Sequence, residues 1–246
     1  MQNIIENLAH LHNHIDEYCS QSGRSSAEVT LLCVSKTKPE EMIKCAYEQG
    51  ERHFGESYIS EAVDKVVSLK KQGYQDIVWH FIGPIQSNKT KHIAAHFDVV
   101  ESVDRLKILE RLHEQRPADL PPLKVLLQVN ISKEAQKQGC EAEELPELLA
   151  KAATLPNIEV IGLMGVALIN ADDATLAQEF GFLQTLLHQY QAQYPSLKVL
   201  SMGMTDDMRV AIQQGSTEVR VGTAIFGARA YPHKPQATTL DSAPNN

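Results

Sequence analysis

Hydrophobic residues along this chain recur in two alternating patterns. Short runs rich in Val, Leu and Ile predict strands buried on both faces, at residues 31–35, 52–55, 77–82, 98–102, 124–130, 159–164, 198–202 and 218–222. Apolar residues three and four positions apart predict helices between them, at residues 40–49, 59–71, 88–95, 105–115, 143–154, 174–194 and 206–214, with a short final one at 223–228. Each predicted strand is thus followed by a predicted helix.

A further helix is predicted ahead of the first strand, over residues 2–21. Its apolar face consists of Ile4, Leu8, Leu11, Ile15 and Tyr18. Alternating strands and helices form either an open doubly wound sheet or a closed barrel. Eight strands within about 200 residues favour the barrel. We therefore predict an α/β fold, a (β/α)8 TIM barrel with an extra N-terminal helix, and the open sheet remains the alternative.

The domain organisation follows from the same pattern. No repeat or linker interrupts the alternation, so we expect one domain over residues 1–231. Residues 232–246 are polar and contain proline, which predicts a flexible C-terminal tail.

Composition narrows the range of partners. The 246 residues include 23 basic and 31 acidic side chains, a formal net charge of −8, which disfavours nucleic-acid binding because phosphate contacts need clustered Lys and Arg. The longest apolar run, residues 160–169, is about half as long as a membrane span requires. The first residues lack the basic start and apolar stretch of a signal peptide, and the four cysteines form no CxxC pair. We expect a cytoplasmic protein without nucleic-acid or membrane partners.

A lysine occupies the position where barrel enzymes carry their chemistry. Active residues of a (β/α)8 barrel lie at the C-terminal ends of the strands, and Lys36 directly follows the first predicted strand. Partial desolvation there would lower the pKa of its ammonium and favour Schiff-base formation. The alternative is an ordinary surface lysine, which is how we interpret the neighbouring Lys38.

Glycine-containing turns follow the seventh and eighth predicted strands. Gly203 and Gly222 allow the backbone to approach a ligand closely, and Thr205 is suited to begin the next helix. Barrels often bind phosphate between these two loops, so the pair predicts a phosphate site. The alternative is that both glycines only form tight turns.

Other polar residues on the strands have open roles. Arg220 would direct a cation into the barrel, unless it forms a salt bridge with an acid such as Glu218. His80 is either a proton-transfer group or, as we favour, a hydrogen-bonded wall residue. His10 and His14 lie one helical turn apart, but no nearby Cys or carboxylate completes a metal site. We predict no metal.

Six segments of the chain form a recognisable set: VSKTKP (34–39), RHFGES (52–57), WHFIGPIQSNK (79–89), GLMG (162–165), SMGMTDDM (201–208) and RVGTAIFGAR (220–229). Together they resemble the pyridoxal phosphate homeostasis protein family. Members of that family are small single-domain proteins that bind pyridoxal 5′-phosphate (PLP) and have the fold of the alanine racemase N-terminal barrel. Each segment alone is weak, but all six occur in the expected order over residues 31–230.

The resemblance implies a role for each of these segments. Lys36 would hold PLP as a reversible Schiff base, and Arg220 would face the pyridine nitrogen, where a cation weakens PLP as an electron sink. The residues implied around the phosphate are Ser201, Gly203, Met204, Thr205, Gly222 and Thr223. Further residues expected near the cofactor are Ser57, His80, Asn88 and Met164. The family usually has Asn in place of Ser57 and Ser in place of Thr205, and Thr205 retains the hydroxyl.

The function implied is that of a PLP-binding protein of vitamin B6 homeostasis, with effects on amino-acid metabolism and no strong catalytic turnover. The alternative is a PLP-dependent amino-acid racemase, which needs a second base that we identify nowhere in this sequence. A Schiff-base aldolase typically carries its lysine on strand six, but residues 159–164 contain none. We expect a monomer that passes PLP to PLP-dependent apoenzymes.

Overall fold

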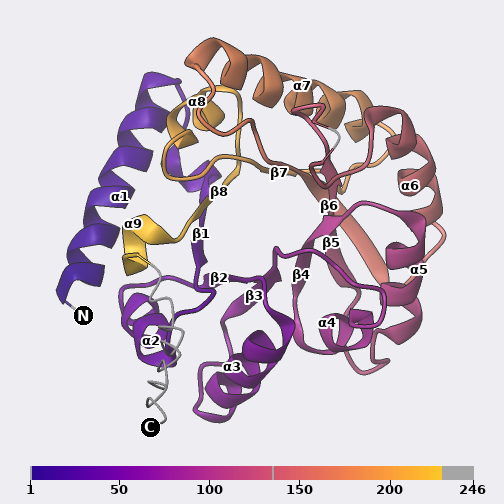
Figure 1. Cartoon of the computed structure of the whole chain (residues 1–246), viewed down its shortest axis with the longest axis horizontal. Helices are drawn as coiled ribbons and strands as arrows, with labels where there is room; N and C mark the ends of the chain where they lie inside the picture. The colour runs from indigo at the N-terminus through magenta and orange to yellow at the C-terminus, as the bar shows by residue number, and fades with distance from the viewer. Residues whose placement is uncertain (1, 135, 229–246) are drawn as a thin grey trace, which may run out of the picture.

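Eight parallel strands form a closed barrel in the computed structural model (Figure 1), with β8 pairing back onto β1. The strands are β1 (Thr30–Val34), β2 (His53–Glu56), β3 (Val78–Phe81), β4 (Val99–Val103), β5 (Leu123–Val129), β6 (Ile158–Gly165), β7 (Val199–Ser201) and β8 (Glu218–Val221). The structure describes residues 2–134 and 136–228, so the predicted tail over residues 232–246 lies outside the described residues. The predicted (β/α)8 barrel is confirmed, and the open sheet is excluded.

Helices surround the barrel and follow the strands in turn (Figure 1). They are α1 (Gln2–Gln21), α2 (Glu40–Glu48), α3 (Ile59–Lys71), α4 (Thr90–His96), α5 (Leu106–Gln115), α6 (Leu145–Ala152), α7 (Asp173–Gln191), α8 (Met208–Gln213) and α9 (Thr223–Phe226). Two short 3-10 helices, η1 (Ser26–Glu28) and η2 (Ala142–Glu144), precede β1 and α6. Within the described residues, no helix combines the length and the apolar character needed to cross a bilayer.

The ends of the strands were easier to predict than the ends of the helices. Every predicted strand agrees with the observed one to within one residue at each end, whereas helix ends differ by up to three residues. Helix ends depend on capping contacts and local turns rather than on apolar spacing. For example, α7 begins at Asp173 because the Asp172 side chain accepts a hydrogen bond from the Thr175 backbone.

The N-terminal helix packs against the outer helices. α1 lies beside α2, α8 and α9 (Figure 1), and Asn7 Nδ2 donates to Ile225 O at 3.0 Å. The buried residues of α1 are Ile4, Leu8, Leu11, Ile15 and Cys19. The prediction that Tyr18 lies on this face is wrong in part, because Cys19 takes the innermost position of the last turn and leaves Tyr18 only partly buried.

The barrel interior contains both apolar and ionisable side chains. Val99, Leu126 and Met164 form a small apolar cluster, separate from the larger core between the strands and helices. On β3 and β4, His80 is 2% exposed and Glu101 is 0% exposed. Burying ionisable groups is costly unless they have partners. The interior therefore needs a network of hydrogen bonds, and this network extends to Arg220 at the candidate site.

Candidate functional site

A cavity of about 510 Å³ lies at the C-terminal ends of β1 and β8. Six residues of the expected cofactor site line it together: Lys36, Met204, Thr205, Arg220, Gly222 and Thr223. The rest of its lining consists of Val34, Lys38, Ile82, Asp206, Ala224 and Gly227. Because β1 pairs with β8, barrel closure brings the loop after the first strand next to the loops after the last two.

The loop that carries Lys36 is held at both neighbouring residues. Ser35 Oγ donates to Glu56 Oε1 at 2.7 Å. Thr37 has a left-handed backbone with φ 63°, and its N–H donates to Glu61 Oε1 at 2.8 Å. A threonine keeps this conformation only where the surrounding contacts hold it. The backbone on both sides of Lys36 is therefore fixed, and its side chain lines the cavity.

A buried lysine on α3 connects these two contacts. Lys65 Nζ donates to Ser35 O and to Glu56 Oε1, both at 3.0 Å, and pairs with Glu61 Oε1 at 2.5 Å. Burial raises the pKa of Glu56, an effect that the nearby Lys65 ammonium opposes. The role of Lys65 was not predicted from the sequence, because a lysine within a helical pattern normally indicates an exposed face.

The interpretation of Lys38 as a surface residue is wrong. Lys38 is 8% exposed, and its Nζ donates to the backbone carbonyls of Phe226, Gly227 and Ala228 at 3.2, 2.8 and 2.7 Å. Carbonyls at a helix C-terminus lack intrahelical partners, so the ammonium satisfies them. Lys38 thus ties the Lys36 loop to the end of α9.

The structure favours glycine at positions 203 and 222 on different physical grounds. Gly203 has φ 99°, and a Cβ there would lie 2.6 Å from Ala211 Cβ, so this turn packs against α8. At Gly222 a Cβ would lie 3.1 Å from Val34 O, beside the cavity. Gly222 lines the cavity directly. For Gly203 the structure favours the alternative, a glycine required by the turn and its packing.

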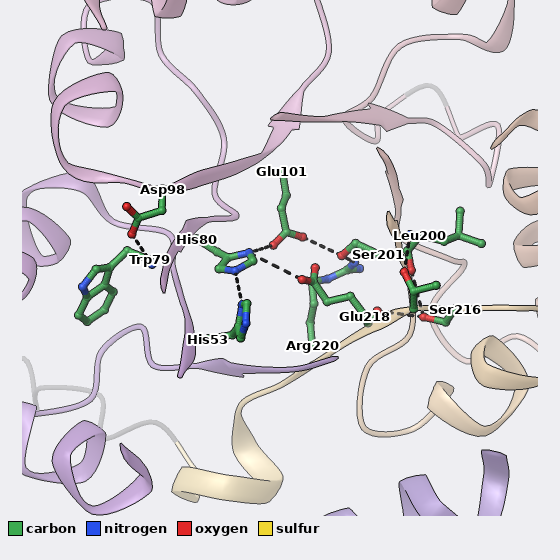
Figure 2. Close-up of polar contacts among 11 residues, drawn as sticks. His53, Trp79, His80, Asp98, Glu101, Leu200, Ser201, Ser216, Glu218 and Arg220 are labelled. Carbon is green, nitrogen blue, oxygen red and sulfur yellow. Dashed lines mark hydrogen bonds and ion pairs between the residues drawn. The ribbon is translucent and has the colours of Figure 1, made fainter. Parts of the chain in front are cut away.

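Arg220 lies on β8 and lines the cavity. Its Nη1 donates to Ser201 Oγ at 2.7 Å (Figure 2). Its Nη2 donates to Gly165 O at 2.9 Å. Ser201 Oγ in turn donates to Glu101 Oε2 at 2.7 Å. In the part of the chain that the structure describes, no ion pair joins Arg220 to Glu218, so that alternative partner is wrong. Ser201 thus joins Arg220 to the carboxyl group of Glu101 by hydrogen bonds.

His80 links this chain of hydrogen bonds to His53 on β2 (Figure 2). Its Nδ1 lies 2.7 Å from Glu101 Oε1 and 3.8 Å from Glu218 Oε2, and its Nε2 lies 2.9 Å from His53 Nδ1. Both ring nitrogens thus have partners, which agrees with the interpretation of His80 as a hydrogen-bonded wall residue. Ligand atoms of His80, Glu101 and Glu218 lie within 4.8 Å of one another, a spacing that suits a metal ion. The His80–Glu101 hydrogen bond and the adjacent Arg220 cation favour a charge cluster instead.

Burial and mutual charge set the protonation of this cluster. Burial, aided by the charge of Glu101, raises the pKa of Glu218 to about 8. Burial alone would raise the pKa of Glu101, but the hydrogen bond and charge of His80 outweigh it and lower that pKa. Burial disfavours a charged His80, but the carboxylates of Glu218 and Glu101 outweigh it and raise the pKa. Burial and the charge of His80 lower the pKa of His53 to about 4. Burial and the neighbouring charges therefore keep the pKa of Glu218 well above that of Glu101.

Four other residues were expected near the cofactor, and none of them belongs to the cavity lining that the described residues form. Met164 belongs to the apolar cluster of the interior, and His80 belongs to the charge cluster. Asn88 is exposed in the turn before α4. Ser57 follows β2, and its backbone packs so closely on Gly83 that a Cβ there would lie 2.4 Å from Ser57 O.

Comparisons with known sequences match nearly the whole chain. The family described as "Alanine racemase, N-terminal domain" matches residues 6–230. The pyridoxal phosphate homeostasis protein of Escherichia coli (strain K12) is 46% identical over 237 residues, which cover 95% of this chain and 100% of that protein. The protein of the same name from Pseudomonas aeruginosa is 49% identical over 231 residues, which cover 94% of this chain and 98% of that protein.

Two solved structures also resemble this chain over most of its length. PipY of Synechococcus elongatus, solved with PLP bound, is 34% identical and has a TM-score of 0.78, covering 91% of this chain and 100% of that chain. Alanine racemase from Corynebacterium glutamicum is 15% identical with a TM-score of 0.67, covering 92% of this chain and 61% of that chain, and this likeness shows the fold alone. Because relatives of 46–49% identity match it over nearly its full length, the chain belongs to the pyridoxal phosphate homeostasis protein family, which shares the barrel of the alanine racemase N-terminal domain.

Proposed function

We propose that this protein binds PLP in the cavity through a reversible Schiff base on Lys36 and acts in cytoplasmic PLP homeostasis. One observation carries the proposal: Lys36 and Arg220 line the same cavity of about 510 Å³. That volume lies within the range of about 300–1,000 Å³ typical of sites for small ligands and cofactors. The relatives named for PLP homeostasis and the PLP-bound structure of PipY support the choice of ligand.

The lining residues suit the chemical groups of PLP. The amine of Lys36 can condense with the aldehyde carbon and release one water molecule, and hydrolysis reverses this step. The hydroxyls of Thr205 and Thr223, with the open backbone at Gly222, offer neutral hydrogen-bonding groups for a phosphate. Arg220 offers a cation to the pyridine nitrogen of the cofactor. When bound, PLP supplies an electrophilic aldehyde and an electron-withdrawing ring.

Reversible binding suits a carrier better than a catalyst. Free PLP reacts with many amines, so a protein that binds and releases it limits such reactions. We propose that the protein is a monomer, that it passes PLP to PLP-dependent apoenzymes, and that it thereby affects amino-acid metabolism. Size-exclusion chromatography with light scattering tests the monomer, and a mass of two chains contradicts it.

The decisive experiment combines absorption, chemical trapping and one substitution. The purified protein is mixed with PLP, reduced with borohydride and digested, and the peptides are analysed by mass spectrometry. We expect a near-visible band and a pyridoxyl group on Lys36, both lost in Lys36→Ala and both kept in Lys71→Ala, which removes an exposed lysine. No band at saturating PLP, or a modification elsewhere with Lys36 unmodified, contradicts the proposal.

The same sample distinguishes a carrier from the alternative, an amino-acid racemase. The PLP-loaded protein is incubated with L-alanine and with other L-amino acids, and the D-enantiomers are measured by chiral chromatography. A carrier produces D-amino acids no faster than free PLP. Multiple turnovers per hour that disappear in Lys36→Ala would establish the racemase.

A further inference from the structure

Two anchors on different strands set the orientation of the Arg220 guanidinium. One anchor is Gly165 O on β6, a backbone carbonyl that cannot turn, 2.9 Å from Nη2. The other is the hydroxyl of Ser201 on β7, 2.7 Å from Nη1. An arginine has five N–H donors, so these two bonds leave three for a ligand. The direction in which those three point depends on both anchors.

The Ser201 hydroxyl is a reliable anchor only because of Glu101. A serine hydroxyl rotates freely and carries a single proton. Here it donates that proton to Glu101 Oε2 at 2.7 Å, which leaves a lone pair directed at Arg220. Ser201 and Glu101 are both 0% exposed, so water does not compete for either group.

The other carboxylate oxygen of Glu101, Oε1, is held by His80. His80 Nδ1 lies 2.7 Å from Glu101 Oε1, and His53 Nδ1 lies 2.9 Å from His80 Nε2 (Figure 2). Burial, together with the charge of Glu101, raises the pKa of the other interior carboxyl group, Glu218, to about 8. Among the described residues, Glu101 is the interior carboxylate that hydrogen bonds join to Arg220, through one hydroxyl.

We infer that Glu101 is a positioning residue of the cofactor site, which acts through Ser201 to fix the orientation and balance the charge of Arg220 where this cation meets the bound cofactor. The inference rests on the proposed function, because it concerns the side of the cavity that receives the PLP ring. Glu101 itself is not among the residues that line the cavity in the described part of the chain. It determines how tightly the ring is held and how strongly the cation acts on it.

Two substitutions test the inference, each removing a different part of the connection. Glu101→Gln keeps the shape but removes the charge, and Ser201→Ala removes the hydroxyl alone. We expect each to raise the dissociation constant of PLP about tenfold, the effect of losing a charge-assisted hydrogen bond. Both should shift the near-visible absorption maximum of bound PLP in the same direction. Thr90→Val is the matched control: it removes a hydroxyl that is 0% exposed on α4 and hydrogen-bonded to Gln115, and should change neither readout.

A double-mutant cycle separates positioning from general destabilisation. If Glu101 acts through Arg220, Glu101→Gln has no further effect on PLP affinity or absorption in an Arg220→Gln background. Effects that multiply independently, or a Glu101→Gln protein with wild-type affinity and spectrum, overturn the inference. If Glu101→Gln folds poorly by circular dichroism, the milder Ser201→Ala gives the same cycle.

The proposed function and the inference can fail separately. Wild-type protein that takes up no PLP overturns both. Wild-type protein that is modified on Lys36, together with Ser201→Ala and Glu101→Gln variants of unchanged affinity, overturns the inference alone and leaves the proposed function standing.

Discussion

Lys65 leads to a stability prediction that can be worked out from its contacts. It is 7% exposed and pairs with Glu56, which is 0% exposed and whose Oε2 has no hydrogen-bond partner. Lys65→Met keeps a long unbranched side chain but leaves the buried Glu56 carboxylate with the Ser35 hydroxyl as its partner. Removing one member of a buried ion pair costs about 3–5 kcal/mol, because the other charge stays uncompensated. We expect the free energy of unfolding at neutral pH to fall by that amount.

The loss should depend on pH in one direction. Burial already holds the folded-state pKa of Glu56 above its unfolded value, and without Lys65 it rises further. Between the two pKa values the folded state keeps a proton that the unfolded state has released, so stability falls as pH rises through that interval. The difference between Lys65→Met and wild type should therefore be smaller at about pH 5, where Glu56 is more easily protonated, than at about pH 8.

Urea unfolding of the protein without PLP, followed by circular dichroism at several pH values, measures this effect. Lys71→Met changes an exposed lysine at the end of the same helix and should stay within about 0.5 kcal/mol of wild type. The double variant Lys65→Met/Glu56→Leu removes both charges and should recover most of the loss, since apolar replacement of a buried pair is often neutral. A loss below about 1 kcal/mol for Lys65→Met, or a loss that does not grow with pH, would refute the reasoning.

Three other changes address separate features. Lys38→Met removes the ammonium that holds the end of α9. We expect it to lower the free energy of unfolding in urea by about 1–3 kcal/mol and to speed the loss of PLP on dialysis. Unchanged PLP retention contradicts a link between this contact and the cofactor site. Gly162→Ala places a Cβ 1.9 Å from Val199 O. We expect it to lower the free energy of unfolding by more than about 2 kcal/mol, measured by thermal unfolding. An unfolding midpoint equal to that of wild type contradicts this close strand contact. Glu218 has a folded pKa of about 8, raised above its unfolded value, so it makes stability fall by about 1.4 kcal/mol per pH unit between the two values. Glu218→Gln should flatten the stability–pH curve over that interval, and an unchanged slope counts against the assignment.

Local sequence patterns were sufficient for the architecture. Runs of branched apolar residues give buried parallel strands wherever they occur, and three-four spacing gives a helix with one apolar face. Both patterns span only a few residues, so the strands were predicted to within one residue and the barrel followed from their number. Lys36 was found for the same reason, because its place directly after β1 puts it at the barrel mouth.

The sequence does not show which ionisable side chains the barrel buries. Glu101 lies in a short run, VVESV, that indicates an ordinary strand, and its partner Ser201 is 100 positions away. In a closed barrel both faces of a strand are buried, so alternation alone does not reveal which side chains meet in the interior.

Lys36, Arg220 and the glycine turns could thus be read from the sequence by itself, since strand ends and turn residues are local features. The contacts that hold these residues in place were decided by the tertiary structure alone: Glu101 behind Arg220, Lys65 beside the Lys36 loop, and Lys38 at the end of α9. The physical reason is that burial turns an ordinary polar residue into a partnered one, and burial is settled only when the first and last strands pair and close the barrel.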